Sequence, residues 1–339
     1  ALVDTGRQHN LFRRRDKKTF RHDCDPDWGG LEFQDLVVWS MLPYWKTGIF
    51  GDGEGQAHVI LTARAACGLF SCLTTMAIEH PDFTINDIDA AGFKAAYERY
   101  GSVVLRDVFD PARLAPVLER AREAYFVRDW QYRRGQLPDR LYHGMDEFGH
   151  VSALDLDVPD GEKLSILNLV TDSAIWPLYQ GLFGPRVAFI LGNSLPRRLG
   201  VEGAAPTPFH QDAAFMGDPA LVMNSWISLV PCGQTAPGLE VVLDPTREFI
   251  TPPELKSGRA STYKQLELPE SYITSRFGEQ CLWAPRLNVG DVLFFSHLTI
   301  HRTYQKPEMD QQRISLEIRC VSGDAVDALK GQYQFLVRE

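Results

Sequence analysis

The chain has 339 residues, of which 44% are hydrophobic and 23% are charged, and its formal net charge is −9 at pH 7. This composition indicates a globular protein with a sizeable core, folded as one large domain with elaborations or as two domains. The acidic balance argues against a protein that binds nucleic acid without regard to sequence, because such proteins present a basic surface.

The cysteines and the apolar runs indicate the cellular compartment that the protein is expected to occupy. The six cysteines are scattered and include no C-x-x-C pair, which favours reduced thiols in a cytoplasmic protein. The longest apolar run, residues 65–78, is short and interrupted by Gly, Ser and Thr. It therefore predicts a buried helix and no membrane span. No N-terminal segment has the charged-then-apolar plan of a signal peptide.

The N-terminal quarter of the chain has the least regular pattern. Residues 1–30 are polar and rich in arginine, which predicts a solvated arm, with an arm that binds anions or a second subunit as the alternative. Residues 31–83 carry aromatic residues and glycine-rich turns. We assign residues 1–83 to an N-terminal extension that serves as a lid or as a contact in a homodimer, and residues 84–339 to the main domain.

A regular pattern begins near Asp87. Apolar residues at helical spacing continue to Gly101, which suits the turn after a helix C-terminus. Residues 102–109 form a short run rich in β-branched side chains. Asp110 followed by Pro111 then marks the N-cap and first turn of another helix. The pattern predicts a helix, a strand and a second helix in succession.

Short runs rich in Val, Ile, Phe and Leu follow, separated by Gly, Pro and Asp. They are residues 186–195, 206–215, 221–232, 238–245, 291–304 and 313–321. They predict an antiparallel sandwich or jelly roll, so that the protein is mainly β with flanking helices (α+β) and has no parallel βαβ architecture. Residues 249–285 form a long polar insertion of the kind that covers or borders a site.

The run at 206–215 contains His210 and Asp212. Because residues i and i+2 of a strand point to the same face, these two side chains are expected to converge as two ligands of one metal ion. A second His-x-Asp, at His80 and Asp82, serves as a control. It contains Pro81, which removes a ladder hydrogen bond and predicts a turn. A hydrogen-bonded polar pair without a metal is the alternative for His210 and Asp212.

The run at 291–304 supplies two histidines, His297 and His301. Two histidines and one carboxylate form a ferrous site with coordination positions left open for a chelating cosubstrate and O2. If the run is one unbroken strand, both histidines point to the same face. Periodicity therefore does not choose between them.

The last run alternates, and its polar face carries Arg313, Ser315, Glu317 and Arg319. An arginine aimed into the cavity of the metal site would form a fork for a dicarboxylate, with the hydroxyl of Ser315 or Thr303 as a partner. A metal triad beside an arginine is the plan of an oxygenase that uses 2-oxoglutarate.

From about residue 90 onward, the chain resembles the phytanoyl-CoA dioxygenase (PhyH-like) family of Fe(II)/2-oxoglutarate-dependent oxygenases. The similarity lies in the opening FKAAYERYGSVVLRDVFDPARL and in the segments TPFHQD, GLEVVLDPTRE, GDVLFFSHLTIHRT and RISLEIR. The chain departs from the family in reading LDPTRE where the family segment ends in PGSH. The resemblance implies a double-stranded β-helix core, the jelly-roll fold of cupin-like proteins.

The resemblance also implies roles for individual residues. His210, Asp212 and His301 would bind Fe(II), and Arg313 would pair with the distal carboxylate of 2-oxoglutarate. His297 is then a residue of the core or a neighbour of a ligand, and it is the substitute candidate for His301. Further candidates for the cosubstrate site are Thr303 and Trp226 from the resemblance, Ser315 from its place on the face of Arg313, and Asn193 from the preceding run. Gln211 is expected to be structural. An anionic substrate would be met by Arg197, Arg198 and Arg302, for which a solvated surface is the alternative.

The implied activity is that of a dioxygenase that uses Fe(II), 2-oxoglutarate and O2 and releases succinate and CO2. Hydroxylation of an unactivated C–H bond in a small molecule or secondary metabolite is the expected reaction, with desaturation, ring formation and epoxidation also open. Two alternatives are a non-catalytic jelly-roll binding protein and a cupin-like metalloenzyme that does not use 2-oxoglutarate. No nucleic-acid partner is expected.

Overall fold

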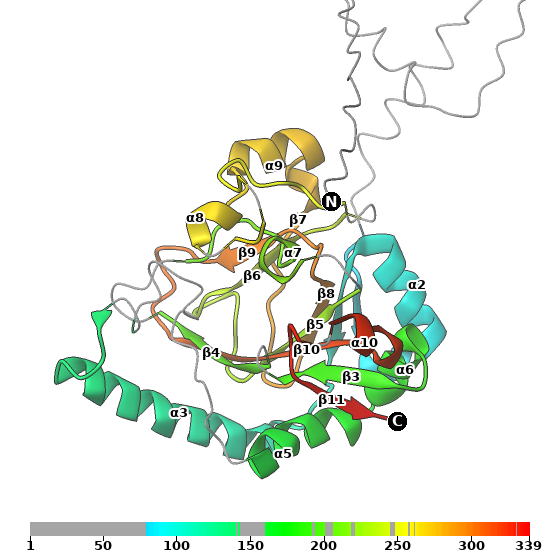
Figure 1. The fold of residues 1–339 in the computed structure, drawn as a ribbon, viewed down its shortest axis with the longest axis horizontal. Coiled ribbons are helices and arrows are strands. Elements are labelled where there is room, and N and C mark those ends of the chain that lie inside the picture. Colours follow the sequence, from blue (N-terminus) through cyan, green and yellow to red (C-terminus); the bar gives the residue numbers. More distant parts are fainter. Residues whose placement is uncertain are drawn as a thin grey trace, which may run out of the picture. The chain divides into compact units, whose positions relative to one another are not determined.

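The structure is a computed structural model. It describes residues 79–139, 142, 160–191, 194–200, 206–217, 221–244, 248–256, 258–260, 262–329 and 331–339. Almost all of the predicted N-terminal extension, with the helix expected at 65–78, lies outside the described residues, and so does Asn193. The part that the structure describes is mainly β-sheet with flanking helices (Figure 1).

The larger of two sheets has eight strands within the described residues, in the order β1-β2-β8-β5-β10-β3-β11, with β4 also paired to β10. Its strands are β1 (Asp82–Thr84), β2 (Ser102–Arg106), β3 (Val187–Ile190), β4 (Leu195–Leu199), β5 (Met223–Ser228), β8 (Val292–Ser296), β10 (Arg313–Ser322) and β11 (Phe335–Arg338). Only the β1–β2 pair among these strands is parallel. The long strand β10 lies between β5 on one edge and β4 and β3 on the other.

The smaller sheet consists, in the described part of the chain, of β7 (Leu282–Trp283), β6 (Gly238–Val242) and β9 (His301–Tyr304), paired antiparallel in the order β7-β6-β9. It packs face to face against the larger sheet. Trp226 and Leu293 of the larger sheet share one buried cluster with Leu239 and Val241 of the smaller sheet. The space between the sheets is therefore a packed core at this level.

Helices cover the other face of the larger sheet. They are α2 (Ala90–Tyr100), α3 (Pro111–Arg133), α5 (Asp160–Thr171) and α6 (Trp176–Phe183). Ile314, Leu316 and Ile318 of β10 belong to the buried cluster that includes helix residues such as Phe93 and Leu114. Figure 1 shows α3 and α5 along this side of the sheet, with the smaller sheet on the opposite side. The alternation of β10 thus turns its polar residues toward the smaller sheet.

The helix ends follow local sequence signals. The side chain of Asp110 accepts a hydrogen bond from the backbone N–H of Ala112 at 2.9 Å and caps α3, whose first residue is Pro111. Gly101 ends α2 in the left-handed conformation, with φ of 74°. Both predicted helix signals are confirmed. None of the described helices is long and apolar enough to cross a membrane.

Two of the predicted strands differ from the structure. Residues 206–215 contain only an isolated β-bridge at His210, followed by a turn and the short helix α7 (Ala213–Met216). The run 291–304 is divided into β8 and β9 by a turn in which Thr299 donates its backbone N–H to the carbonyl of Ser296 at 3.0 Å. Side-chain oxygens in this turn take up further backbone N–H groups, which stabilise the break.

The polar insertion at 249–285 contains α8 (Tyr263–Leu266), α9 (Glu270–Phe277), the 3-10 turn η4 (Glu279–Cys281) and β7. The remaining short elements are η2 (Ile85–Asp87), η5 (Gly323–Ala325) and α10 (Val326–Leu329). Tyr263 and Leu266 of α8 line the cavity described below. The insertion therefore borders that cavity, as its length and composition predict.

Candidate metal centre and adjoining cavity

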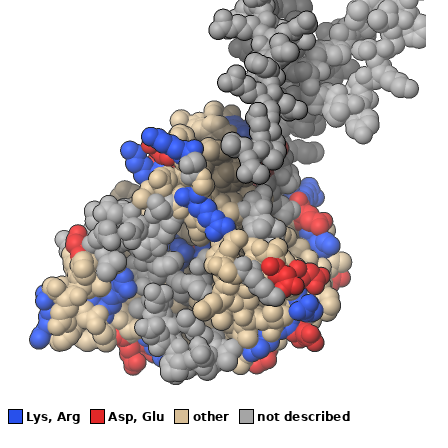
Figure 2. Space-filling model, in the orientation of Figure 1, with Lys and Arg blue, Asp and Glu red and all other residues tan. Residues whose placement is uncertain are grey.

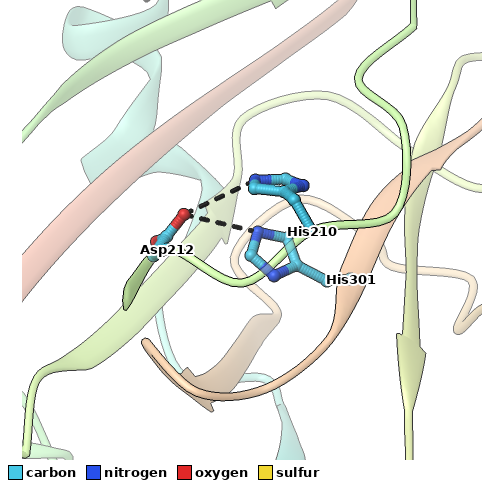
Figure 3. A group of neighbouring side chains, drawn as sticks. All are labelled: His210, Asp212 and His301. Atoms are coloured by element: carbon cyan, nitrogen blue, oxygen red, sulfur yellow. Dashed lines mark ion pairs between the residues drawn. The ribbon is translucent and has the colours of Figure 1, made fainter. Parts of the chain in front are cut away.

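His210, Asp212 and His301 converge at one point between the sheets (Figure 3). One potential ligand atom from each lies within 4.8 Å of the others. Nε2 of His210 is 3.5 Å from Oδ1 of Asp212, and Nε2 of His301 is 3.8 Å from the same oxygen. All three side chains are buried. Within the described residues, no other group of His, Cys, Asp and Glu has this geometry.

Backbone pairing places the two histidines side by side. His210 and His301 each donate a backbone N–H to the other's carbonyl at 2.9 Å, which adds His210 to the free edge of β9. Asp212 has helical backbone angles, φ −59° and ψ −26°, and precedes α7. Its carboxylate converges on the histidines through a turn, so the prediction of convergence agrees with the structure but the strand that motivated it is wrong.

Both imidazole rings present the same nitrogen to Asp212. Nδ1 of His210 lies 2.9 Å from the carbonyl oxygen of Pro208, and Nδ1 of His301 lies 2.9 Å from that of Thr299. A carbonyl only accepts hydrogen bonds, so each Nδ1 carries a proton and the neutral ring has its lone pair on Nε2. The two Nε2 atoms are therefore ready to donate to a metal ion.

A buried arginine and asparagine hold the other oxygen of Asp212. Oδ2 accepts hydrogen bonds from Nδ2 of Asn224 at 2.8 Å and from Nη2 of Arg319 at 3.0 Å. Nε of Arg319 also donates to Oδ1 of Asn224 at 2.7 Å, so the three side chains form a closed triangle. Oδ1 of Asp212 is thereby left to face the histidines. Alternation had placed Arg319 on the correct face, but neither it nor Asn224 had been predicted to contact Asp212.

The electrostatic environment keeps these groups in metal-binding form. Burial by itself raises the pKa of Asp212, but the charge of Arg319 overcomes this and holds the pKa well below its ordinary value. Burial, assisted by His210, lowers the pKa of His301 to about 4. At neutral pH Asp212 is therefore ionised and His301 is neutral, the forms that coordinate a cation.

His297 lies outside the cluster. It occupies the turn between β8 and β9, where its Nδ1 accepts a hydrogen bond from the backbone N–H of Val222 at 3.3 Å. Its carbonyl accepts from the backbone N–H of Ala213 at 2.9 Å. The turn is what separates the two histidines, because it turns His297 away while His301 starts β9.

A cavity adjoins the cluster. The volume that the centre of a water molecule can reach is about 50 Å³, which is room for a few waters or part of a small molecule. Apart from the cluster, the lining has a polar part (Arg197, Thr207, Arg302, Thr303, Arg313, Glu317 and Arg319) and a part formed by Phe215, Leu239, Tyr263 and Leu266. On the face shown in Figure 2, basic and acidic side chains are interspersed.

Among the arginines of this lining, Arg313 has no acidic partner in the described part of the chain. It is buried, and no carboxylate of the described residues lies within ion-pair distance of it. Nη1 donates to the carbonyl of Gly238 at 3.3 Å, while Nε has no hydrogen-bond partner in the described part of the chain. Burial lowers the pKa of its guanidinium below the ordinary value. The geometry leaves a buried cation facing a cavity next to the metal-binding cluster.

The other predicted cosubstrate residues occupy different positions. Thr303 lines the cavity, and its Oγ1 accepts from the backbone N–H of Thr207 at 3.2 Å. Trp226 is fully buried and does not belong to the lining, but the guanidinium of Arg313 lies 5.7 Å from its ring centroid. Ser315 lies two residues after Arg313 and is buried. Its hydroxyl has no hydrogen-bond partner among the described residues.

The three arginines predicted to meet an anionic substrate or solvent differ from one another. Arg197 and Arg302 line the cavity. Arg198 is buried on the helix side of the sheet, where it forms two hydrogen bonds with Asp129 of α3, at 2.5 and 2.9 Å. The expectation of a solvated or substrate-facing side chain is therefore wrong for Arg198, because strand alternation turns it away from its neighbour Arg197.

Gln211 is structural. Its Nε2 donates to the carbonyls of Glu248 and Leu298, at 2.7 and 2.5 Å, and its Oε1 accepts from the backbone N–H of Ile250 at 2.8 Å. These bonds tie the His210–Asp212 segment to the turn after β8 and to the start of the insertion. The orientation of the two flanking ligand candidates depends on this anchor.

Comparison with known proteins finds structures that resemble this chain but assigns no family to it. No protein-family model and no curated protein matches the chain. Solved structures that resemble it include the epimerase SnoN in complex with Fe3+, alpha ketoglutarate and nogalamycin RO (18% identity, TM-score 0.46, 69% of this chain and 83% of that chain). They also include the non-heme alpha ketoglutarate dependent carbocyclase SnoK from nogalamycin biosynthesis (16% identity, TM-score 0.46, 70% and 86%).

A third similar structure is the non-heme monooxygenase ThoJ in its apo form, with 12% identity and a TM-score of 0.41 over 68% of this chain and 77% of that chain. At identities and TM-scores this low, these similarities assign neither a family nor an activity to the chain. The chemical argument depends on the side chains of the site itself.

Proposed function

We propose that this protein is an Fe(II)- and 2-oxoglutarate-dependent oxygenase of the PhyH-like type, with a double-stranded β-helix formed by the two facing sheets. One observation carries the proposal. A buried arginine that has no acidic partner among the described residues, Arg313, faces the same cavity as a His-Asp-His cluster whose ligand atoms already point to one another.

The donor set fits a ferrous ion. Two imidazole nitrogens and one carboxylate oxygen, from His210, His301 and Asp212, are the ligands of mononuclear iron sites that keep coordination positions open. The bonds from Asn224 and Arg319 to the far oxygen of Asp212 favour coordination through Oδ1 alone. The absence of a thiolate from the cluster also distinguishes it from common structural zinc sites.

The lining of the cavity fits a dicarboxylate. Arg313 would hold the carboxylate of 2-oxoglutarate that lies far from the metal, through the paired N–H groups of its guanidinium. The hydroxyl of Thr303 lies in the same lining and would assist. Trp226 supports the guanidinium from the core. We retain Ser315 and Asn193 as further candidates for contact with the cosubstrate or substrate.

The oxidising chemistry would come from the metal ion, 2-oxoglutarate and O2, with succinate and CO2 as coproducts. The protein binds and orients the reactants and excludes water from the cavity. We propose hydroxylation of a small-molecule C–H bond as the reaction, carried out by residues 84–339 with residues 1–83 as an extension that forms a lid or a dimer contact.

Anaerobic binding of 2-oxoglutarate to the Fe(II)-loaded protein tests this proposal. The wild-type protein should bind it with an affinity that collapses in Arg313→Met and is kept in Arg186→Met, a control at a half-exposed arginine far along the sheet. Admission of O2 should then produce succinate, even slowly without substrate. An iron-loaded protein that neither binds nor turns over 2-oxoglutarate would refute the proposal in favour of a binding protein or another type of metalloenzyme.

A further inference from the structure

A chain of ion pairs connects the cavity with Asp212. Nη2 of Arg197 lies 2.9 Å from Oε2 of Glu317, which lies 3.1 Å from Nη2 of Arg319. The same nitrogen of Arg319 lies 3.0 Å from Oδ2 of Asp212. Arg197 is on β4 and Glu317 and Arg319 are on β10, whose paired register places Arg197 opposite Ser315. All four side chains line the cavity.

The charges balance within this chain of ion pairs. Arg197 and Arg319 face Glu317 and Asp212, so two cations meet two anions. Arg313, on the same strand as Arg319, adds a third cation, and the charges of a divalent metal on Asp212 and of a 2-oxoglutarate dianion would cancel each other. The loaded wall therefore holds one positive charge in excess, because the metal and the cosubstrate balance each other and three arginines face two side-chain carboxylates.

The fourth arginine of the lining does not alter this count. Arg302 is paired with Glu240 of β6 and with the exposed Glu270 of α9, at 2.5 and 3.0 Å. Its charge is therefore compensated outside the ion-pair chain. The excess is confined to the buried wall formed by β4 and β10, where an uncompensated charge is costly.

Arg197 is the member of the chain that a ligand can reach. Its side chain is 21% exposed, whereas that of Arg319 is 3% exposed and bonded to three neighbours. Nε of Arg197 is buried without a hydrogen-bond partner among the described residues, and Glu317 is shared with Arg319. Arg197 thus presents an incompletely neutralised charge to the cavity.

We propose that the substrate is a monoanion whose carboxylate binds Arg197, with an apolar body against Phe215, Leu239 and Leu266. This inference rests on the proposed function, because bound 2-oxoglutarate would occupy Arg313 and leave the charge of Arg197 for the substrate. A monoanion is favoured over a phosphate dianion because the excess is a single charge. The apolar part of the lining excludes a substrate that is polar throughout.

Binding of matched acids and amides tests the inference. The full chain, loaded with Mn(II) and saturated with 2-oxoglutarate without O2, would be titrated calorimetrically with benzoate and 3-phenylpropanoate and with the corresponding amides. At least one acid should bind about ten-fold or more tightly than its amide, since a hydrogen bond between two charged groups is about twice as strong as one between neutral groups. Arg197→Gln should abolish this difference, and Arg197→Lys should restore part of it.

The affinity for 2-oxoglutarate separates the outcomes. Arg197→Gln should leave it within about three-fold of wild type, which also shows that the variant is folded, whereas Arg313→Met should lower it strongly. Equal binding of acid and amide to wild type, no saturable binding of either acid, or an acid preference that survives Arg197→Gln would overturn the inference. A loss of 2-oxoglutarate affinity in Arg197→Gln would overturn it too, by assigning Arg197 to the cosubstrate. Failure of wild type to bind 2-oxoglutarate would refute the proposed function instead.

Discussion

Arg313 and Arg319 lie on the same face of β10, and their removal should have opposite effects on stability. Arg319 is bonded to Asp212, Asn224 and Glu317. Burial by itself lowers the pKa of Arg319, but the carboxylates of Asp212 and Glu317 raise it above the ordinary value. Arg313 has no acidic partner among the described residues and its pKa is lowered. Methionine keeps much of the length and apolar stem of either side chain and removes only the charged end.

The two substitutions differ in what they leave behind. Arg319→Met leaves the carboxylates of Asp212 and Glu317 buried with a partner removed, which costs about 3–5 kcal/mol of unfolding free energy. Arg313→Met leaves no anion uncompensated and removes a desolvated charge. We therefore expect the unfolding free energy of this variant to stay unchanged or to rise by about 1–2 kcal/mol.

Arg313→Met should weaken the binding of 2-oxoglutarate, although we do not expect it to destabilise the protein. Loss of one partner from a buried charge pair costs about 2–5 kcal/mol, or roughly 30-fold to several thousand-fold in the dissociation constant. Urea unfolding of the metal-free protein, followed by circular dichroism, measures the first quantity. Calorimetry with Mn(II)-loaded protein measures the second. If Arg313→Met destabilised the metal-free protein as much as Arg319→Met, Arg313 would be a structural residue and the dicarboxylate argument would fail.

Further predictions concern the metal, pH and the backbone. Metal at about 100 times its dissociation constant should raise the unfolding free energy by about 2.7 kcal/mol in wild type. His301→Ala should lose this stabilisation by metal, and His297→Ala should keep it. The opposite result would show that His297 is the ligand and His301 is not. Because the pKa of His301 is lowered to about 4 from 6.5, the unfolded chain binds the proton first. The unfolding free energy of the metal-free protein should therefore fall by about 1.4 kcal/mol per pH unit as pH decreases between these values, and His301→Gln should lose that slope in urea titrations. Gly290 has φ of +93°, and a Cβ there would collide with the carbonyl oxygen of Phe109. The control, Gly135, has φ of +68° and free space where a Cβ would lie, so Gly135→Ala should lower the unfolding free energy by only about 1–2 kcal/mol. Gly290→Ala should lower it more, as measured by urea unfolding. Equal losses would show that the Phe109 contact relaxes freely.

Features governed by neighbouring residues could be predicted from the sequence. The cap at Asp110 and the glycine at Gly101 act within one turn of their own helix, so their signals are local. The alternation of residues 313–321 also persists in the structure, because β10 is a long regular strand buried on both faces. It correctly placed Arg313 and Arg319 toward the cavity.

The geometry of the metal-binding cluster depends on contacts that the sequence pattern does not contain. Asp212 reaches the histidines through a turn, and His210 is held by pairing with a residue 91 positions later, His301. The break between His297 and His301 is stabilised by Thr299, whose hydroxyl donates to the carbonyl of Gly101 at 2.9 Å. A tertiary contact of this kind has no periodic signature, which is why periodicity left the two histidines equivalent.

Under the proposed function, the two arginines of β10 meet different requirements of a buried metal site. Asp212 must be ionised to bind a metal, and in a dry environment this requires a permanent cation, which Arg319 provides at the cost of being fully committed. In the proposed function, a ligand that arrives as an anion requires a cation without an anionic partner, and Arg313 would provide it at a cost to the stability of the free protein. The residue type does not explain the difference, because both residues are arginines. Position alone separates them: Arg319 lies beside Asn224 and Glu317, and Arg313 lies at the far end of the strand, where no described carboxylate reaches it.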